Sequence, residues 1–161
     1  MSSWIQEQAA QIKGKQSEVR KAQEWKLHEA EVVRARGRDF LAAIEAEMRV
    51  TIKEWNELFP SDPAQQIQVE KSSKQFGYFE ICKDSFPAAK LKVFFDANAI
   101  LVRYEGFKTN PISQTAYIND GSFGIRLDEK TGCLYPESGT AIRLSLTEIS
   151  QQLIKQIIDT Q

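Results

Sequence analysis

Few side chains in this chain of 161 residues could take part in catalysis or bind a metal ion. His28 is the only histidine, and Cys82 and Cys133 are the only cysteines. Zinc sites need several cysteine and histidine residues at short spacings, and this sequence contains no such set. A nucleophilic pair would require His28 to meet one of the two distant cysteines in space. The sequence therefore offers no catalytic constellation, and we expect neither a metal ion nor another cofactor.

Acidic side chains that could bind a cation fall at or beside expected turns. They are Asp96, Asp120 and the pair Asp128-Glu129. Aspartate at a turn commonly accepts hydrogen bonds from nearby backbone N–H groups. We therefore interpret these carboxylates as turn residues.

Three arginines could form an anion site on the expected sheet. Arg103, Arg126 and Arg143 each lie on the polar face of a different predicted strand. Guanidinium groups bind carboxylates and phosphates through paired hydrogen bonds, so neighbouring strands could combine them into one site. The alternative, which we favour, is cross-strand pairing with Glu105 and Asp128, because opposite charges on adjacent strands stabilise a sheet.

Two other patterns could indicate nucleic-acid binding. The segment Arg34–Arg38 holds three arginines, but helical geometry spreads them over a wide arc, and acidic residues lie close by in the sequence. We favour a solvated helix surface there. Six aromatic residues of the predicted strands are expected in the core rather than on a base-stacking platform. They are Phe76, Phe79, Phe94, Phe95, Tyr104 and Phe123.

A long helix must position these side chains. No proline occurs between Ser3 and Phe59, and Pro60 gives a firm stop. From Val19 onward an apolar stripe repeats every eleven residues, or about 3.67 residues per turn, which keeps it on one face of a nearly straight helix. Its positions are Val19, Ala22, Lys26, Ala30, Val33, Gly37, Leu41, Ile44, Met48, Ile52, Trp55 and Phe59. Before Val19 the stripe is thin, and Ile5, Ile12 and Val19 make at best a weak heptad row.

Gly37 lies on this stripe. Glycine within a helix costs about 1 kcal/mol relative to alanine. A small residue on a buried stripe also lets another element approach closely, so we expect the helix to continue through Gly37.

After Pro60 the apolar residues alternate, which predicts six or seven short strands between Ile67 and Leu144. The last of these is expected at Thr140–Leu144. Breaks are expected at Phe86-Pro87 and around Asn110-Pro111, and Asp120-Gly121 predicts a tight hairpin turn. The sequence Ser145-Leu146-Thr147-Glu148 is a capping box that begins a C-terminal helix.

The fold class that follows is α+β. It has a long N-terminal helix, an antiparallel meander of six to seven short strands, and a C-terminal helix, with the helices covering one face of the sheet. Residues 1–60 form the helical segment, and its distal part, 1–37, is a candidate oligomerisation arm. Residues 61–161 form the sheet and the terminal helix, and pack with residues 38–60 as one domain.

Composition excludes several classes of protein. The formal net charge is -1, and 42% of the residues are hydrophobic and 27% charged, as in an ordinary globular protein. No run approaches the ~18–20 apolar residues of a membrane span, and the N-terminus lacks the pattern of a signal peptide. We expect a cytoplasmic protein with reduced thiols, without membrane partners and without a general attraction to nucleic acid.

The length of the helix suggests what the protein does. At ~1.5 Å per residue it would reach about 85 Å, whereas a strand of the sheet spans ~17–20 Å. We expect a non-catalytic assembly module that forms a homodimer, or binds another protein, through this helix. The expected contacts are Val19, Ala22, Ala30, Val33 and Gly37. Two alternatives stay open: a small-molecule binding protein or enzyme with a pocket at Phe95, Tyr104 and Phe123 between sheet and helices, and nucleic-acid binding at Arg34–Arg38.

Overall fold

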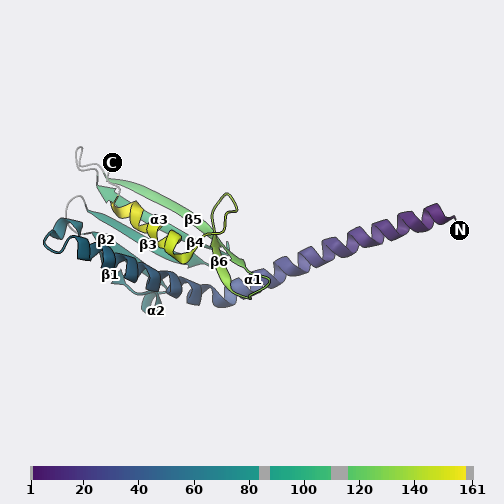
Figure 1. Cartoon of the computed structure of the whole chain (residues 1–161), viewed down its shortest axis with the longest axis horizontal. Helices are drawn as coiled ribbons and strands as arrows, with labels where there is room; N and C mark the ends of the chain where they lie inside the picture. Colours follow the sequence, from purple (N-terminus) through teal and green to yellow (C-terminus); the bar gives the residue numbers. More distant parts are fainter. Residues whose placement is uncertain (1, 84–87, 110–115, 159–161) are drawn as a thin grey trace.

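A computed structural model describes residues 2–83, 88–109 and 116–158 of the chain (Figure 1). The predicted breaks at Phe86-Pro87 and Asn110-Pro111 lie outside these residues. The helices are α1 (Ser3–Leu58), the short 3₁₀ helix η1 (Pro63–Gln65), the single turn α2 (Ser73–Phe76) and α3 (Leu146–Ile158). The strands are β1 (Gln68–Lys71), β2 (Tyr78–Lys83), β3 (Ala89–Asp96), β4 (Leu101–Thr109), β5 (Ala116–Leu127) and β6 (Leu134–Glu137).

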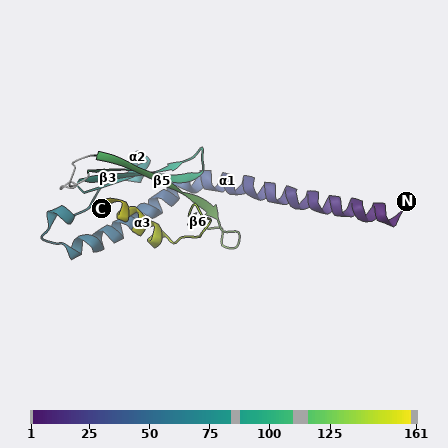
Figure 2. The ribbon, with the colours of Figure 1, turned by 90° about the horizontal axis from the view of Figure 1, so that it is seen from above.

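The six described strands form one antiparallel sheet in chain order, from β1 at one edge to β6 at the other. Helices α1 and α3 lie side by side against one face of this sheet (Figure 2). This arrangement confirms the predicted α+β class, with helices on one face of an antiparallel meander.

Helix α1 runs without interruption for 56 residues, which confirms that it continues through Gly37. Its N-cap is Ser2, whose Oγ accepts a hydrogen bond from the backbone N–H of Ile5 at 3.4 Å. The eleven-residue stripe supplies most of its buried face. The buried stripe residues are Val33, Gly37, Leu41, Ile44, Met48 and Ile52.

The element that closely approaches Gly37 is the sheet of the same chain. The ring of Phe95, on β3, lies directly against the Cα of Gly37, and a Cβ at this position would overlap three atoms of that ring. At this position only glycine fits the packing of α1 on β3 without a movement of this ring.

The core lies between the sheet and the two helices. Phe79, Ile81, Leu91, Val93 and Val102 from the sheet are almost fully buried, as are Ile149, Leu153 and Ile157 from α3. The predicted capping box begins α3: Ser145 N–H donates to Glu148 Oε1 at 3.2 Å, and Glu148 N–H donates to Ser145 Oγ at 3.0 Å.

The predicted hairpin turn at Asp120-Gly121 is wrong. Both residues lie within the continuous strand β5, where Gly121 is paired with Tyr104 of β4. A Cβ at Gly121 would overlap the phenol group of Tyr104. Gly121 therefore leaves room for a large ring on the adjacent strand, and does not supply the positive φ of a tight turn.

The predicted final strand at Thr140–Leu144 is also wrong. Only an isolated bridge between Glu137 and Arg143 is present. Ala141 has a φ of 62°, which interrupts an extended conformation. Leu144 is buried, but Ile142 points outward and is 60% exposed.

The two glycines of α1 provide a matched test of this packing. Gly37→Ala should lower the free energy of unfolding by about 1–2 kcal/mol in spite of the higher helix propensity of alanine, because the ring of Phe95 must move. Gly14→Ala is the control, since nothing lies within 4 Å of a Cβ there. It should leave the unfolding free energy unchanged or raise it by up to about 1 kcal/mol, because alanine favours the helix, and it should increase the helix signal slightly in circular dichroism. Adding Phe95→Leu to Gly37→Ala should recover part of the loss, and a loss equal at both glycines would contradict the packing.

Candidate functional site

The first 26 residues of α1, which we call the arm (residues 3–28), project beyond the sheet (Figure 1). At ~1.5 Å per residue they extend about 40 Å. Every residue from 2 to 24 is exposed. Up to residue 24 the arm is therefore not covered by the sheet or by α3.

An apolar row runs along the arm in water. Ile5, Ile12 and Val19 are 49%, 56% and 57% exposed, and they are spaced by seven residues, or almost two helical turns. In a straight helix this row lies on the same side as Ala30 and Gly37, so it continues the face that packs on the sheet. The described part of the chain leaves this row without a covering element.

A set of polar contacts, which we call the collar, holds α1 where it leaves the sheet. Glu29 Oε2 accepts hydrogen bonds from Arg126 Nε at 3.1 Å and from the backbone N–H of Leu127 at 3.0 Å. Arg34 Nε donates to the carbonyl of Ala97 at 3.4 Å, and Arg36 Nη1 donates to the carbonyl of Gly132 at 2.8 Å. Contacts with two turns of the sheet thus fix the direction in which the arm projects.

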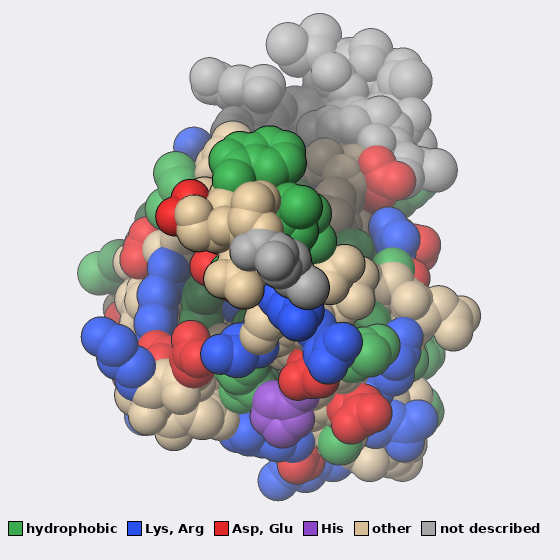
Figure 3. Space-filling view, turned by 90° about the vertical axis from the view of Figure 1, so that its right-hand side faces the viewer, with side chains coloured by type: hydrophobic (Ala, Val, Ile, Leu, Met, Phe, Trp, Pro, Cys, Tyr) green, Lys and Arg blue, Asp and Glu red, His purple; other side chains and the backbone are tan. Residues whose placement is uncertain are grey.

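The collar accounts for two of the three arginines in the Arg34–Arg38 segment. Arg34 and Arg36 bind backbone carbonyls of the same chain. Neither of the two interpretations from the sequence, a solvated helix surface or nucleic-acid binding, predicts these contacts. Figure 3 looks along the arm from its N-terminal end, and basic and acidic side chains are interspersed across this face. On the face that Figure 3 shows, no sector of uniform positive charge for a phosphate backbone is visible.

The three arginines of the predicted anion site each bind a carboxylate. Arg103 Nε lies 2.7 Å from Asp96 Oδ2, and Arg143 Nη1 lies 2.8 Å from Asp128 Oδ2. Arg126 contacts Glu29 at 3.1 Å and Glu137 at 3.4 Å. The pair with Asp128 is one that the sequence predicts, but the partners of Arg103 and Arg126 come from positions that strand alternation does not indicate. An anion would have to displace these carboxylates.

Charge pairing shifts several pKa values. Hydrogen bonding to Arg143 and to the backbone N–H groups of Lys130 and Thr131 lowers the pKa of Asp128 from 3.8 to about 2. A hydrogen bond from Arg103, with further bonds from backbone N–H groups, lowers the pKa of Asp96. The hydrogen bond to Glu29 raises the pKa of Arg126, so this guanidinium stays charged in the collar.

The face of the sheet opposite α1 and α3 carries aromatic residues next to lysines. Lys92 Nζ lies 4.4 Å from the ring centroid of Tyr78 and 5.3 Å from that of Phe94, and Phe76 is 46% exposed. The expectation that Phe76 and Phe94 are core residues is therefore wrong, whereas Phe79 and Phe123 are buried. Carboxylates such as Glu80, which lies 3.9 Å from Lys71, offset the charge of this face, so it lacks the positive field of a nucleic-acid platform.

The pocket expected between sheet and helices is filled by side chains. The space beside Tyr104 and Phe123 has a volume of about 10 Å³, roughly that of one water molecule. Phe95, the third expected lining residue, packs on Gly37. A larger depression of about 460 Å³ lies elsewhere, between α1 and β1, and sequence reasoning gave no signal for it.

The remaining candidate residues do not form a reactive site. Cys82 is buried and Cys133 exposed, and no disulfide joins these two residues. His28 packs against Trp25 on the arm, with ring centroids 5.8 Å apart. Among the described residues, no three His, Cys, Asp or Glu side chains are grouped so as to hold a metal ion. The same part of the chain has no helix with the length and apolarity needed to cross a membrane.

Comparisons of the chain with protein-family models, with curated proteins and with solved structures found no match. The class that the geometry defines is an α+β protein whose single described sheet carries a projecting helical arm.

The collar can be tested at its carboxylate. Glu29→Ala removes two hydrogen bonds and should lower the free energy of unfolding by about 1–2 kcal/mol. The direct reporter is the amide of Leu127, whose hydrogen exchange should become faster because its acceptor is lost. Glu24→Ala, in the exposed arm, is the control and should leave that exchange rate unchanged. Equal exchange in both variants would contradict the collar.

The pair of Asp128 and Arg143 should give a measurable pH dependence. The folded-state pKa of about 2 lies below the ordinary value of 3.8, so the stabilisation is complete above pH 3.8 and is lost as the pH falls through about 2. The carboxyl ¹³C shift of Asp128 should therefore titrate near pH 2, and Arg143→Gln should move the midpoint toward 3.8. Lys130→Gln keeps the backbone N–H and should change it little. A midpoint that does not respond to Arg143→Gln would show that this pair is not the cause.

Proposed function

We propose that the protein is a non-catalytic assembly module that forms a homodimer by pairing its arm with the arm of a second copy. The observation that carries the proposal is the apolar row of Ile5, Ile12 and Val19, which is exposed along a helix with no other support. Isolated helices are marginal in water, and most helical stability in proteins comes from packing an apolar face. Pairing of two arms would supply that packing.

The residues proposed for the contact differ in part from those that the sequence suggests. Val19 and Ala22 are exposed and Ala30 is half-buried, so all three are on the accessible part of the stripe. Val33 is fully buried and Gly37 is covered by Phe95, so the sheet of the same chain already occupies these two positions. The proposed contact therefore shifts toward the N-terminus and includes Ile5 and Ile12.

A second copy is a simpler partner than a different protein. A two-fold axis brings the same row of both chains together, so one apolar surface suffices for both sides of the interface. In an antiparallel pair centred on Ile12, Ile5 of one chain would face Val19 of the other, because both lie seven residues from the centre. In helical projection Gln8, Ala9, Gln16 and Gln23 lie beside this row, and Lys15 lies next to Val19 at its edge. The long side chain of Lys15 can keep its ammonium group in water while the apolar row is buried.

We place this assembly in the cytoplasm as part of the same proposal. Support comes from the exposed thiol of Cys133 and the burial of Cys82, which are not joined in a disulfide. Thiols of this kind persist in a reducing compartment.

The test is the mass of the full chain in solution over a concentration series. The native chain should approach twice the chain mass of 18.4 kDa, and Ile12→Asp or Val19→Asp should give a single chain, because each places a charge in the paired row. Val50→Asp is the matched control, since Val50 is also an exposed valine of α1 but lies on the opposite side of the helix. A native chain that stays monomeric, or an equal effect of Val50→Asp, would overturn the proposal.

A further inference from the structure

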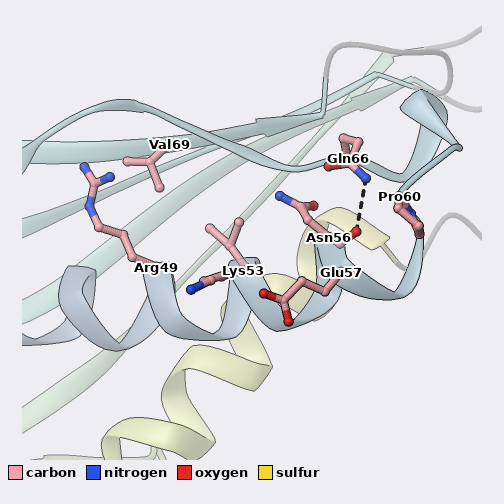
Figure 4. A pocket seen from close by; sticks show the side chains of 8 residues that line it. Arg49, Lys53, Asn56, Glu57, Pro60, Gln66 and Val69 are labelled. Atoms are coloured by element: carbon pink, nitrogen blue, oxygen red, sulfur yellow. Dashed lines mark hydrogen bonds between the residues drawn. The ribbon is translucent and has the colours of Figure 1, made fainter.

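A groove runs between α1 and the edge of the sheet at β1. Its volume is about 460 Å³, and its accessible lining is mainly apolar. Ile52 and Val69 are its aliphatic lining residues. Figure 4 shows Val69 on the strand side, facing the helix that carries Arg49 and Lys53. The polar side chains that line it are Arg49, Lys53, Asn56 and Glu57 from α1 and Gln66 from the approach to β1. The groove is thus bounded by a helix on one side and by a sheet edge on the other.

The edge of the sheet is open along β1. This strand pairs only with β2 in the described sheet, so its other side presents backbone N–H and C=O groups that no strand uses. Just before β1 the same edge is satisfied by a side chain: Asn56 Nδ2 donates to the carbonyl of Ile67 at 2.8 Å, and Ile67 N–H donates to Asn56 Oδ1 at 2.9 Å. The side-chain amide of Asn56 therefore makes the two hydrogen bonds that a neighbouring strand would make with Ile67. Ile67 lies one residue before β1 begins.

The segment leading into β1 is firmly held, so the edge is preorganised. Trp55 Nε1 donates to the carbonyl of Gln65 at 2.7 Å, and Gln66 Nε2 donates to the carbonyls of Phe59 at 2.5 Å and Asn56 at 3.3 Å. These bonds attach the approach to β1 to the last turns of α1. Binding of a ligand would therefore not need to order this wall of the groove, a step that would otherwise cost conformational entropy.

The helix wall carries positive charge at one end. Arg49 and Lys53 lie one turn apart and both line the groove. Arg49 is paired with Glu45 at 3.1 Å, whereas Lys53 has no ion pair with any described residue. Glu57 lies one turn further along, so the charge of the wall changes sign toward Pro60. The free cation at Lys53 is the group to which a ligand's carboxylate would bind.

We propose that this groove binds an extended peptide segment that adds to the sheet beside β1 and directs an acidic side chain to Lys53. An extended segment satisfies the open backbone groups of an edge strand, while alternate side chains enter the adjacent groove and provide specificity. The half-buried side chain of Val69, with the 5% of Ile52 that is exposed, gives the groove apolar surface for β-branched or aromatic side chains. This inference is independent of the arm.

The length of β1 limits the paired segment. The strand has four residues, and its pairing with β2 is irregular between Val69 and Lys71. Short and irregular edges resist pairing with arbitrary strands. Binding therefore depends on side-chain contacts in the groove as well as on backbone pairing, and the preference for an acidic side chain comes from Lys53.

The probe is a library of short random peptides displayed on phage and selected against the full native chain. Selected peptides should share alternating β-branched or aromatic residues with one Asp or Glu between them. Binding of a synthetic selected peptide is then measured by fluorescence anisotropy. Lys53→Glu should weaken it about tenfold, because an attractive charge becomes a repulsive one. Lys74→Glu makes the same charge change on α2 and should leave binding unchanged.

A second measurement separates strand addition from binding by side chains alone. Two versions of the selected peptide are N-methylated at alternate residues, so that only one version loses the N–H groups that face β1. The version that lacks the N–H groups facing β1 should lose binding, and the version methylated at the other residues should retain it. Failure to select any peptide, selection without acidic residues, equal binding by Lys53→Glu, or equal binding of the two methylated versions would each overturn the proposal. Circular dichroism of each variant verifies that the fold is intact.

Discussion

The structure depends on burying the apolar face of a helix that is longer than the sheet available to cover it. From Val33 to Ile52, a distance of about 30 Å along the helix axis, α1 packs on the sheet beside α3. The fit is close enough that the ring of Phe95 occupies the space where a side chain at Gly37 would lie. N-terminal to this interval the same face continues, but the sheet has ended. The arm is therefore a direct consequence of the mismatch between helix length and sheet size.

Polar contacts begin where apolar packing stops. The collar residues Glu29, Arg34 and Arg36 join α1 to the ends of β3 and β5 and to the turn at Gly132. At the other end of α1, Trp55 and Asn56 join the helix to the chain entering β1. Both ends of the packed interval are thus attached to backbone carbonyls or N–H groups of the sheet and its connections. The directions of the arm and of the groove wall are set by hydrogen bonds as well as by packing.

Much of this fold follows from local sequence pattern. The predictions that are wrong concern positions whose structure is determined by residues far away in the sequence. The eleven-residue stripe identifies the buried face of α1, and Ser145 with Glu148 marks the start of α3, because each signal lies within one element. Asp120-Gly121 has the local signature of a turn, but the need for Gly121 comes from Tyr104 on another strand. Likewise, Arg126 pairs with Glu29, 97 residues earlier in the chain, so strand alternation could not indicate its partner. The groove at Lys53 and Val69 arises only when β1 becomes an edge strand, and no local pattern predicts that position.

The two proposed contact surfaces lie at opposite ends of one rigid helix, and this has a consequence for assembly. Lys53 is 24 residues from Glu29, or about 36 Å along α1, so a partner on the arm would not obstruct the groove. A homodimer formed through the arms would present two grooves on one particle. A partner with two acidic extended segments could then bind both, and its second contact would be intramolecular, with a high effective concentration set by the spacing of the grooves. Weak binding at each short edge strand would thereby become strong binding to the assembly, and the length of α1 would then have a functional role beyond covering the sheet.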